Sequence, residues 1–114
     1  MEIVIIKDKI SREKLQELAR AIFGDMVKVV VDVERSLMAA GGEMHADCEQ
    51  VLLDNGSSQG NLWGANIYPD STGDDFIEYK SLINIRPKIG NRSMNIEDES
   101  TRFKVKSVIT SFIG

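Results

Sequence analysis

The fold is decided by residues 62–93, which read LWGANIYPDSTGDDFIEYKSLINIRPKIGNRS. From Phe76 to Arg86, apolar and polar side chains alternate almost without interruption, and a period of two is typical of a half-buried β-strand. Leu62 to Tyr68 repeats this alternation, and the turn formers of PDSTGDD separate the two runs. The stretch therefore predicts a β-hairpin whose second strand is long.

An alternative divides the second strand at Lys80-Ser81 into two short strands. Neither residue adopts positive φ cheaply, so this pair makes a poor two-residue turn, and one long strand is preferred. In the hairpin, the numbers of paired residues are expected to sum to an even value, because a slip of one residue turns the apolar face to solvent. The inward face would then hold Trp63, Ala65, Ile67, Ile77, Tyr79, Ile83 and Ile85, and the outward face Asn66, Tyr68, Glu78, Lys80, Asn84 and Arg86.

Apolar spacing and capping residues predict the other elements. Strands are expected at 2–6, 26–33 and 37–44, and helices after the caps Ser11, Asp47 and Asp98. The helix capped by Asp47 would cover 48–54 and bury Cys48, Val51 and Leu52. Residues 43–49 also fit a strand, with His45, Asp47 and Glu49 on one face, and both alternatives remain open.

The predicted order is β-α-β-β-α-β-β-α in a single domain covering residues 1–114. Hairpins dominate this order, which favours the α+β class. We expect a two-layer sandwich with a mostly antiparallel sheet of about five strands, covered by three helices on one face. The uncovered face would hold Asn66, Tyr68, Asn84 and Arg86.

Composition narrows the class of protein. The net charge of −4 makes nucleic-acid binding unlikely, since such proteins present a basic face. Cys48 is the single cysteine and forms no internal disulfide, which fits a reducing compartment. The first ten residues have neither the basic start of a signal peptide nor the apolar length of a membrane span. The sequence therefore predicts a cytoplasmic protein without a membrane partner.

The charges are segregated along the chain. Residues 36–79 contain eight acidic side chains and no Lys or Arg, whereas residues 80–96 contain four basic side chains and no acid. One interpretation is a solvated surface on which the two signs happen to separate. The other is a pair of complementary patches that meet across a contact between proteins.

The basic segment Arg86–Ser93 is the first candidate site. Gly90 and Asn91 tolerate positive φ, so successive backbone N–H groups there are able to form an anion-binding nest. The proposed ligand-binding residues are Arg86, Lys88, Asn91, Arg92 and Ser93, with Asn66, Asn84 and Tyr68 orienting the ligand. The alternative is an ordinary turn whose bases are solvated or paired with Glu97 and Asp98.

A divalent metal is a weaker candidate. Asp32, Glu34 and His45, with Asp47 and Glu49, would offer oxygen-rich ligands if neighbouring strands brought them together. Their spacing matches no metal motif, and with one histidine a nitrogen-rich zinc site is excluded. A Cys48–His45 nucleophile is weaker still, because Cys48 falls on the apolar side of its helix. No cofactor is predicted.

The segments GDMVKVVVDVE, EMHAD, NLWGANIYP and SLINIRPKIGNRS resemble a small family of prokaryotic domains of unknown function. The resemblance covers nearly the whole chain, and LWGANIYP and INIRP followed by GNRS are its most specific motifs. It implies no catalytic residue, substrate or cofactor.

The sequence thus specifies a fold more closely than a function. The favoured hypothesis is a non-catalytic binding or assembly module, whose acidic and basic segments meet across a homo-oligomer contact or engage a partner. The alternative is an enzyme or sensor that holds a small phosphate or carboxylate ligand at Arg86–Ser93, with or without a divalent metal.

Overall fold

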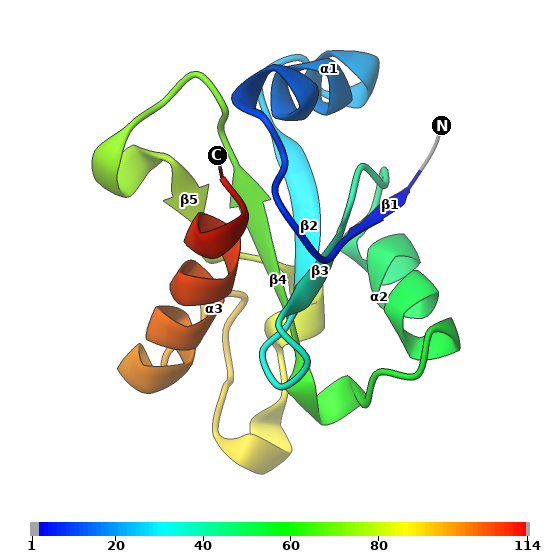
Figure 1. The fold of residues 1–114 in the computed structure, drawn as a ribbon. Coiled ribbons are helices and arrows are strands. Elements are labelled where there is room, and N and C mark those ends of the chain that lie inside the picture. The colour runs from blue at the N-terminus through cyan, green and yellow to red at the C-terminus, as the bar shows by residue number, and fades with distance from the viewer. Residues whose placement is uncertain (1–2, 114) are drawn as a thin grey trace.

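The computed structural model describes residues 3–113 as three helices on a five-stranded antiparallel sheet (Figure 1). The strands follow one another across the sheet in the order β1-β3-β2-β4-β5. The predicted α+β class, the antiparallel sheet and the element order are confirmed. The bounds are β1 (Val4–Ile6), α1 (Arg12–Ile22), β2 (Val27–Asp32), β3 (Leu37–Ala40), α2 (His45–Asp54), β4 (Leu62–Ile67), β5 (Ile77–Glu78) and α3 (Glu99–Phe112).

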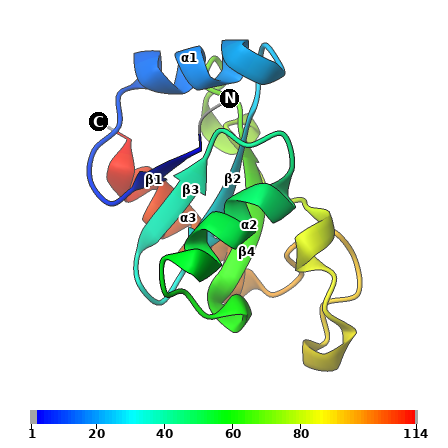
Figure 2. The ribbon, with the colours of Figure 1, turned by 90° about the vertical axis from the view of Figure 1, so that its right-hand side faces the viewer.

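The helices lie on both faces of the sheet, so the prediction that they cover one face is wrong (Figure 2). Odd-numbered β2 and β4 side chains face α1 and α3 and form the larger core. Even-numbered ones such as Val30 and Leu62 pack with Cys48 and Leu52 of α2 in a smaller core. The two-layer prediction therefore accounts for the sheet with α1 and α3, but not for α2.

Two helix starts are as predicted. The Ser11 hydroxyl accepts a hydrogen bond from the Lys14 N–H at 3.0 Å, and the Asp98 carboxylate accepts one from the Thr101 N–H at 2.8 Å. The helical alternative for the middle segment is also confirmed, but Asp47 is not its cap. The cap is Met44, and the buried spacing His45, Cys48, Leu52 carries the helical period back to His45.

The long second strand of the hairpin is wrong, whereas the register is confirmed. β5 contains two residues, and Asn66 pairs with Glu78 and Ile67 with Ile77, so the numbers sum to an even value. Beyond β5 the chain crosses above β4, because Ser81 packs directly on Gly64. The Ser81 hydroxyl then accepts a hydrogen bond from the Ile83 N–H and begins a short 3₁₀ helix, Leu82–Asn84.

Side chains, rather than a strand, satisfy the rest of the β4 edge. The Gly64 N–H donates to Asn84 Oδ1 at 2.8 Å, and Asn84 Nδ2 donates to the Gly64 carbonyl at 3.0 Å. Arg86 Nη2 donates to the Leu62 carbonyl. Ile83 packs on the α2 side and Ile85 is 42% exposed, so the prediction that both face inward beside Trp63 is also wrong.

The strand at 37–44 is shorter than predicted. β3 ends at Ala40 because Gly41 adopts a φ of +102°, a left-handed conformation that turns the chain. The strand at 2–6 is observed from Val4, and Glu2 lies outside the described residues. Within residues 3–113, no helix has the length and apolarity needed to cross a membrane.

Candidate ligand-binding site

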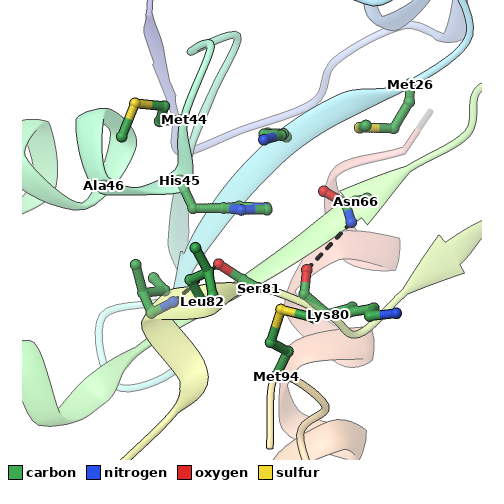
Figure 3. A pocket seen from close by; sticks show the side chains of 11 residues that line it. Met26, Met44, His45, Ala46, Asn66, Lys80, Ser81, Leu82 and Met94 are labelled. Atoms are coloured by element: carbon green, nitrogen blue, oxygen red, sulfur yellow. Dashed lines mark hydrogen bonds between the residues drawn. The ribbon is translucent and has the colours of Figure 1, made fainter.

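A hollow of about 360 Å³ opens where α2 begins above the sheet (Figure 3). Its walls come from the start of β2, the first turn of α2, β4 and the segment that crosses above β4. Most of the lining is apolar, and the polar groups are few. The lining residues are Met26, Lys28, Met44, His45, Ala46, Asn66, Lys80, Ser81, Leu82, Ile83 and Met94.

The strand register explains the position of this hollow. Lys28 of β2 lies opposite Asn66 of β4, and Asn66 lies opposite Glu78 of β5, so the three side chains share the α2 face. Further along this face, α2 covers Val30 and its neighbours. Because α2 begins at His45, the polar end of the face is left open.

Asn66 is the central polar residue of the site. Its side-chain Nδ2 donates to Glu78 Oε1 at 2.9 Å and to the Lys80 carbonyl at 3.2 Å. These two acceptors fix the orientation of the amide, since only the nitrogen donates. The residue is 6% exposed, and among residues 3–113 its buried Oδ1 has no hydrogen-bond partner. The contact between the Asn66 amide and the His45 ring raises the pKa of His45. Figure 3 shows this oxygen on the side of the amide that faces away from Lys80, toward the hollow.

His45 projects from the first turn of α2 toward β4 (Figure 3). Its Nε2 lies 2.9 Å from the Ala65 carbonyl oxygen, which only accepts, so Nε2 carries the proton. Burial lowers the pKa of His45, and the positive charge of Lys28 lowers it further, whereas contacts with Ala65 and Asn66 raise it. The ring is therefore neutral, and Nδ1 is left as an acceptor.

Gly64 lies directly beneath Ser81 and the His45 ring. A Cβ atom at Gly64 would lie 2.5 Å from Ser81 Cβ and 3.2 Å from His45 Cδ2. Only glycine allows Ser81 and the His45 ring to approach β4 this closely. The single glycine in the middle of β4 therefore shapes the site.

The residues of the predicted anion loop do not converge on one open space. The Glu97 carboxylate accepts hydrogen bonds from the backbone N–H groups of Arg92 and Ser93, at 3.0 and 2.8 Å. Contacts with Ser93 and the Arg92 backbone lower the pKa of Glu97. The nest expected from this sequence thus already holds a carboxylate of the chain itself, while the Lys88 side chain is exposed to solvent.

Arg86 and Asn91 have other partners. The Arg86 guanidinium lies 4.6 Å from the centre of the Trp63 ring, and burial lowers its pKa. Asn91 Nδ2 donates to the Asn84 carbonyl at 2.7 Å and to two further carbonyls, and Asn91 Oδ1 accepts from the Glu97 N–H. Both side chains hold the loop in shape.

The remaining predicted ligand-orienting residues divide between two environments. Asn84 is fully buried against Gly64, as described above, and lies outside the lining of the hollow. Tyr68 is half-buried, and its hydroxyl donates to Glu78 Oε1 at 3.2 Å. Of the eight predicted ligand-binding residues, Asn66 alone lines the hollow.

The metal candidates are held apart. The buried Asp32 carboxylate accepts hydrogen bonds from the backbone of Glu34 and Arg35 and from the Ser57 hydroxyl at 2.6 Å, so it fixes the turn after β2. His45 lies at the other end of the α2 face, beside Ala65. Among residues 3–113, no three His, Cys, Asp or Glu side chains are grouped to share a metal ion.

Cys48 is buried in the smaller core. Burial raises the pKa of its thiol to about 11, so the thiol stays protonated at neutral pH. A protonated thiol is a poor nucleophile, and this environment agrees with the structural reading of the residue.

Sequence reasoning missed several residues of the site. Lys28 interrupts the apolar run Val27–Val31 of β2, and that charge is a usable signal for a polar end of the sheet face. Ser81 falls within the predicted long strand, whereas its observed position above β4 depends on Gly64. Met26, Met44 and Met94 gave no signal, because they are far apart in the sequence and meet only in the fold.

A comparison with protein-family profiles matched residues 4–112 to DUF5674, described as a protein of unknown function. The chain belongs to the DUF5674 family. This membership confirms the resemblance drawn from the LWGANIYP and INIRP-GNRS motifs to a family without an assigned function. Comparisons with curated proteins and with solved structures found no match. The function of this DUF5674 chain therefore has to be argued from its own geometry.

Proposed function

We propose that this domain is a non-catalytic binding module whose ligand is a small, mostly apolar molecule held between α2, β4 and the 3₁₀ helix Leu82–Asn84. The observation that carries the proposal is Asn66 Oδ1, a buried acceptor without a partner at the wall of an apolar hollow. Buried polar atoms are normally hydrogen-bonded, and an orphaned one in a hollow favours an absent partner. The ligand is expected to donate a hydrogen bond to this oxygen.

The size and chemistry of the hollow support this proposal. A volume of about 360 Å³ lies within the range of small-molecule sites, which are largely apolar with a few fixed polar groups. Three methionines line it, and their flexible thioethers adapt to ligands of different shape. Its polar groups favour holding a ligand over chemistry, since His45 already donates to Ala65 and Ser81 accepts from Ile83.

Ligand-observed NMR with a library of small amphipathic molecules tests this function. The variant Ala46→Trp places an indole at the mouth of the hollow from an exposed position of α2. Ser107→Trp, at an exposed position of α3, is the matched control. We expect hits that bind the unmodified chain and Ser107→Trp but not Ala46→Trp. Hits that bind all three proteins equally, or the absence of any hit, would count against the proposal.

A second candidate function is self-association through the projecting segment, residues 82–92. Its outer part, around the 3₁₀ helix Pro87–Ile89, extends from the body of the molecule in both views, whereas Asn84 and Asn91 are buried at its base (Figures 1 and 2). The segment exposes Leu82 and Ile89, at 73% and 61%, and carries three basic side chains. The acidic side chains of α2 on a second copy have the complementary charge, and such pairs promote association. Apolar side chains exposed on a projection favour a protein contact.

Size-exclusion chromatography with light scattering tests self-association. We expect a dimer or larger species at low salt that dissociates in high salt, because the contact pairs opposite charges. Ile89→Ser should weaken it, whereas Phe103→Ser, at an exposed apolar residue of α3, should not. A monomer at every protein and salt concentration would exclude this second function and leave the small-molecule site untouched.

A further inference from the structure

Resting on the proposed function, we infer that the ligand is an anionic amphiphile: a carboxylic acid with an apolar body and an N–H or O–H group. The carboxylate would lie at the start of α2, near Lys28 and Lys80. The N–H or O–H group would donate to Asn66, and the apolar body would lie against the methionines. This assignment differs from the predicted anion loop in both place and residues.

The start of α2 is the first observation. Its cap residue, Met44, provides no side-chain acceptor, whereas Ser11 and Asp98 cap the other two helices. The first backbone N–H groups of a helix have no partner within the helix, and they attract anions. In the described chain, neither the His45 nor the Ala46 N–H donates a hydrogen bond to another group. Met44, His45 and Ala46 all line the hollow.

The charges around the hollow are the second observation. Lys28 and Lys80 both line it, and within residues 3–113 no acidic side chain does. The Glu78 carboxylate, beside Asn66, already accepts hydrogen bonds from Asn66 and Tyr68. Glu43 and Asp47 adjoin the lining residues Met44 and Ala46 in the sequence, but both side chains are exposed and neither lines the hollow. The neutral His45 ring adds no charge of either sign. An anion entering here therefore meets two cations and a helix start.

Asn66 adds the third requirement and is independent of the helix start. The residue is only 6% exposed, and its Oδ1, which has no partner within residues 3–113, accepts hydrogen bonds but does not donate them. A ligand with only an anionic group would leave this oxygen unpaired and would add repulsion beside it. The ligand must therefore carry a donor as well as an acid. The donor separates the proposed class from simple fatty acids, and the apolar body separates it from phosphate.

Matched pairs of compounds test the inference. N-acetyl-leucine, N-acetyl-methionine and N-acetyl-phenylalanine each supply an apolar body, an N–H donor and a carboxylate. Their primary amides have nearly the same shape but replace the carboxylate with a neutral amide. Isocaproate keeps the acid and the leucine-like body but lacks the N–H group. Binding to the full chain is measured by chemical-shift titration, with inorganic phosphate as a further probe.

We expect at least one acid to bind at the hollow about tenfold more tightly than its amide, because the helix start and the two lysines attract the negative charge. Isocaproate should bind more weakly than N-acetyl-leucine. Met44→Asp, which supplies a carboxylate in the cap position, should abolish the preference for the acid by occupying the site. Asn66→Leu should remove the difference between N-acetyl-leucine and isocaproate.

The inference is overturned if the amides bind as tightly as the acids, or if phosphate or isocaproate binds as well as the N-acetyl acids. It is also overturned if no acid shifts the resonances of His45, Ala46 or Asn66 at millimolar concentration. Neutral hits that Ala46→Trp blocks would then preserve the small-molecule site while rejecting its anionic character. The absence of hits of any charge would reject the proposed function itself.

Discussion

Gly64 is the residue on which the geometry of the hollow depends most directly. Gly64→Ala forces a Cβ to within 2.5 Å of Ser81 Cβ, so the segment above β4 must move. We expect a loss of about 1–3 kcal/mol in the free energy of unfolding, the usual cost of overpacking. Urea denaturation measures it, with Gly60→Ala as control, since a Cβ at Gly60 meets nothing within 4 Å. Equal stability of the two variants would refute the close packing of Ser81.

His45 predicts a pH dependence of stability. Its pKa is lowered in the folded chain by burial and by Lys28, with Glu78 opposing. As pH falls below about 6.5, the unfolded chain binds a proton that the folded chain does not, so stability is lost toward the folded pKa. Between pH 7 and 5.5 we expect the unmodified chain to lose more stability than His45→Gln. Parallel denaturation curves for the two proteins would show that His45 is not buried in the neutral form.

At the scale of one element, the edge of β4 depends on hydrogen bonds from a side chain. β5 ends at Glu78, and the Asn84 side chain takes over the pairing of the Gly64 N–H and carbonyl groups. Asn84→Ala leaves two buried backbone groups unpaired, and we expect a loss of at least about 2 kcal/mol in the free energy of unfolding. Asn95→Ala, at an exposed asparagine, is the control and should stay within about 0.5 kcal/mol. A small effect at Asn84 would mean that water replaces its side chain.

Element by element, the sequence predicted most where the signal was local. The caps Ser11 and Asp98 and the β-branched run of β2 specify their elements through neighbouring residues, and all three are confirmed. The alternation from Phe76 to Arg86 did not predict a strand correctly, because Asn84 and Arg86 are polar for another reason. Asn84 and Arg86 donate to β4 from a chain that crosses the sheet face, which a period of two does not distinguish from a strand.

At the scale of the whole molecule, the predicted and observed folds differ most in the position of α2. α2 has ten residues and leaves one end of the second sheet face open. The helix begins at His45, whose ring contacts the Ala65 carbonyl of β4. The sequence identified Asn66 as a polar, outward residue of β4 and His45 as a chemically distinctive one. The sequence did not predict that Asn66 and His45 lie close together, because α2 and the turn into β4 separate them along the chain. The Arg86–Ser93 loop remains a prediction as a ligand site, with Glu97 seated in its backbone nest.

The central claim, that the hollow beside Asn66 holds a ligand, is tested most directly by a crystal structure of the chain soaked with the hits of the NMR screen. We expect density between His45, Asn66 and the methionines, with a ligand N–H or O–H within hydrogen-bond distance of Asn66 Oδ1. Bound molecules found only elsewhere, with Asn66 Oδ1 paired to the protein and the hollow closed by Met44 and Leu82, would contradict the account.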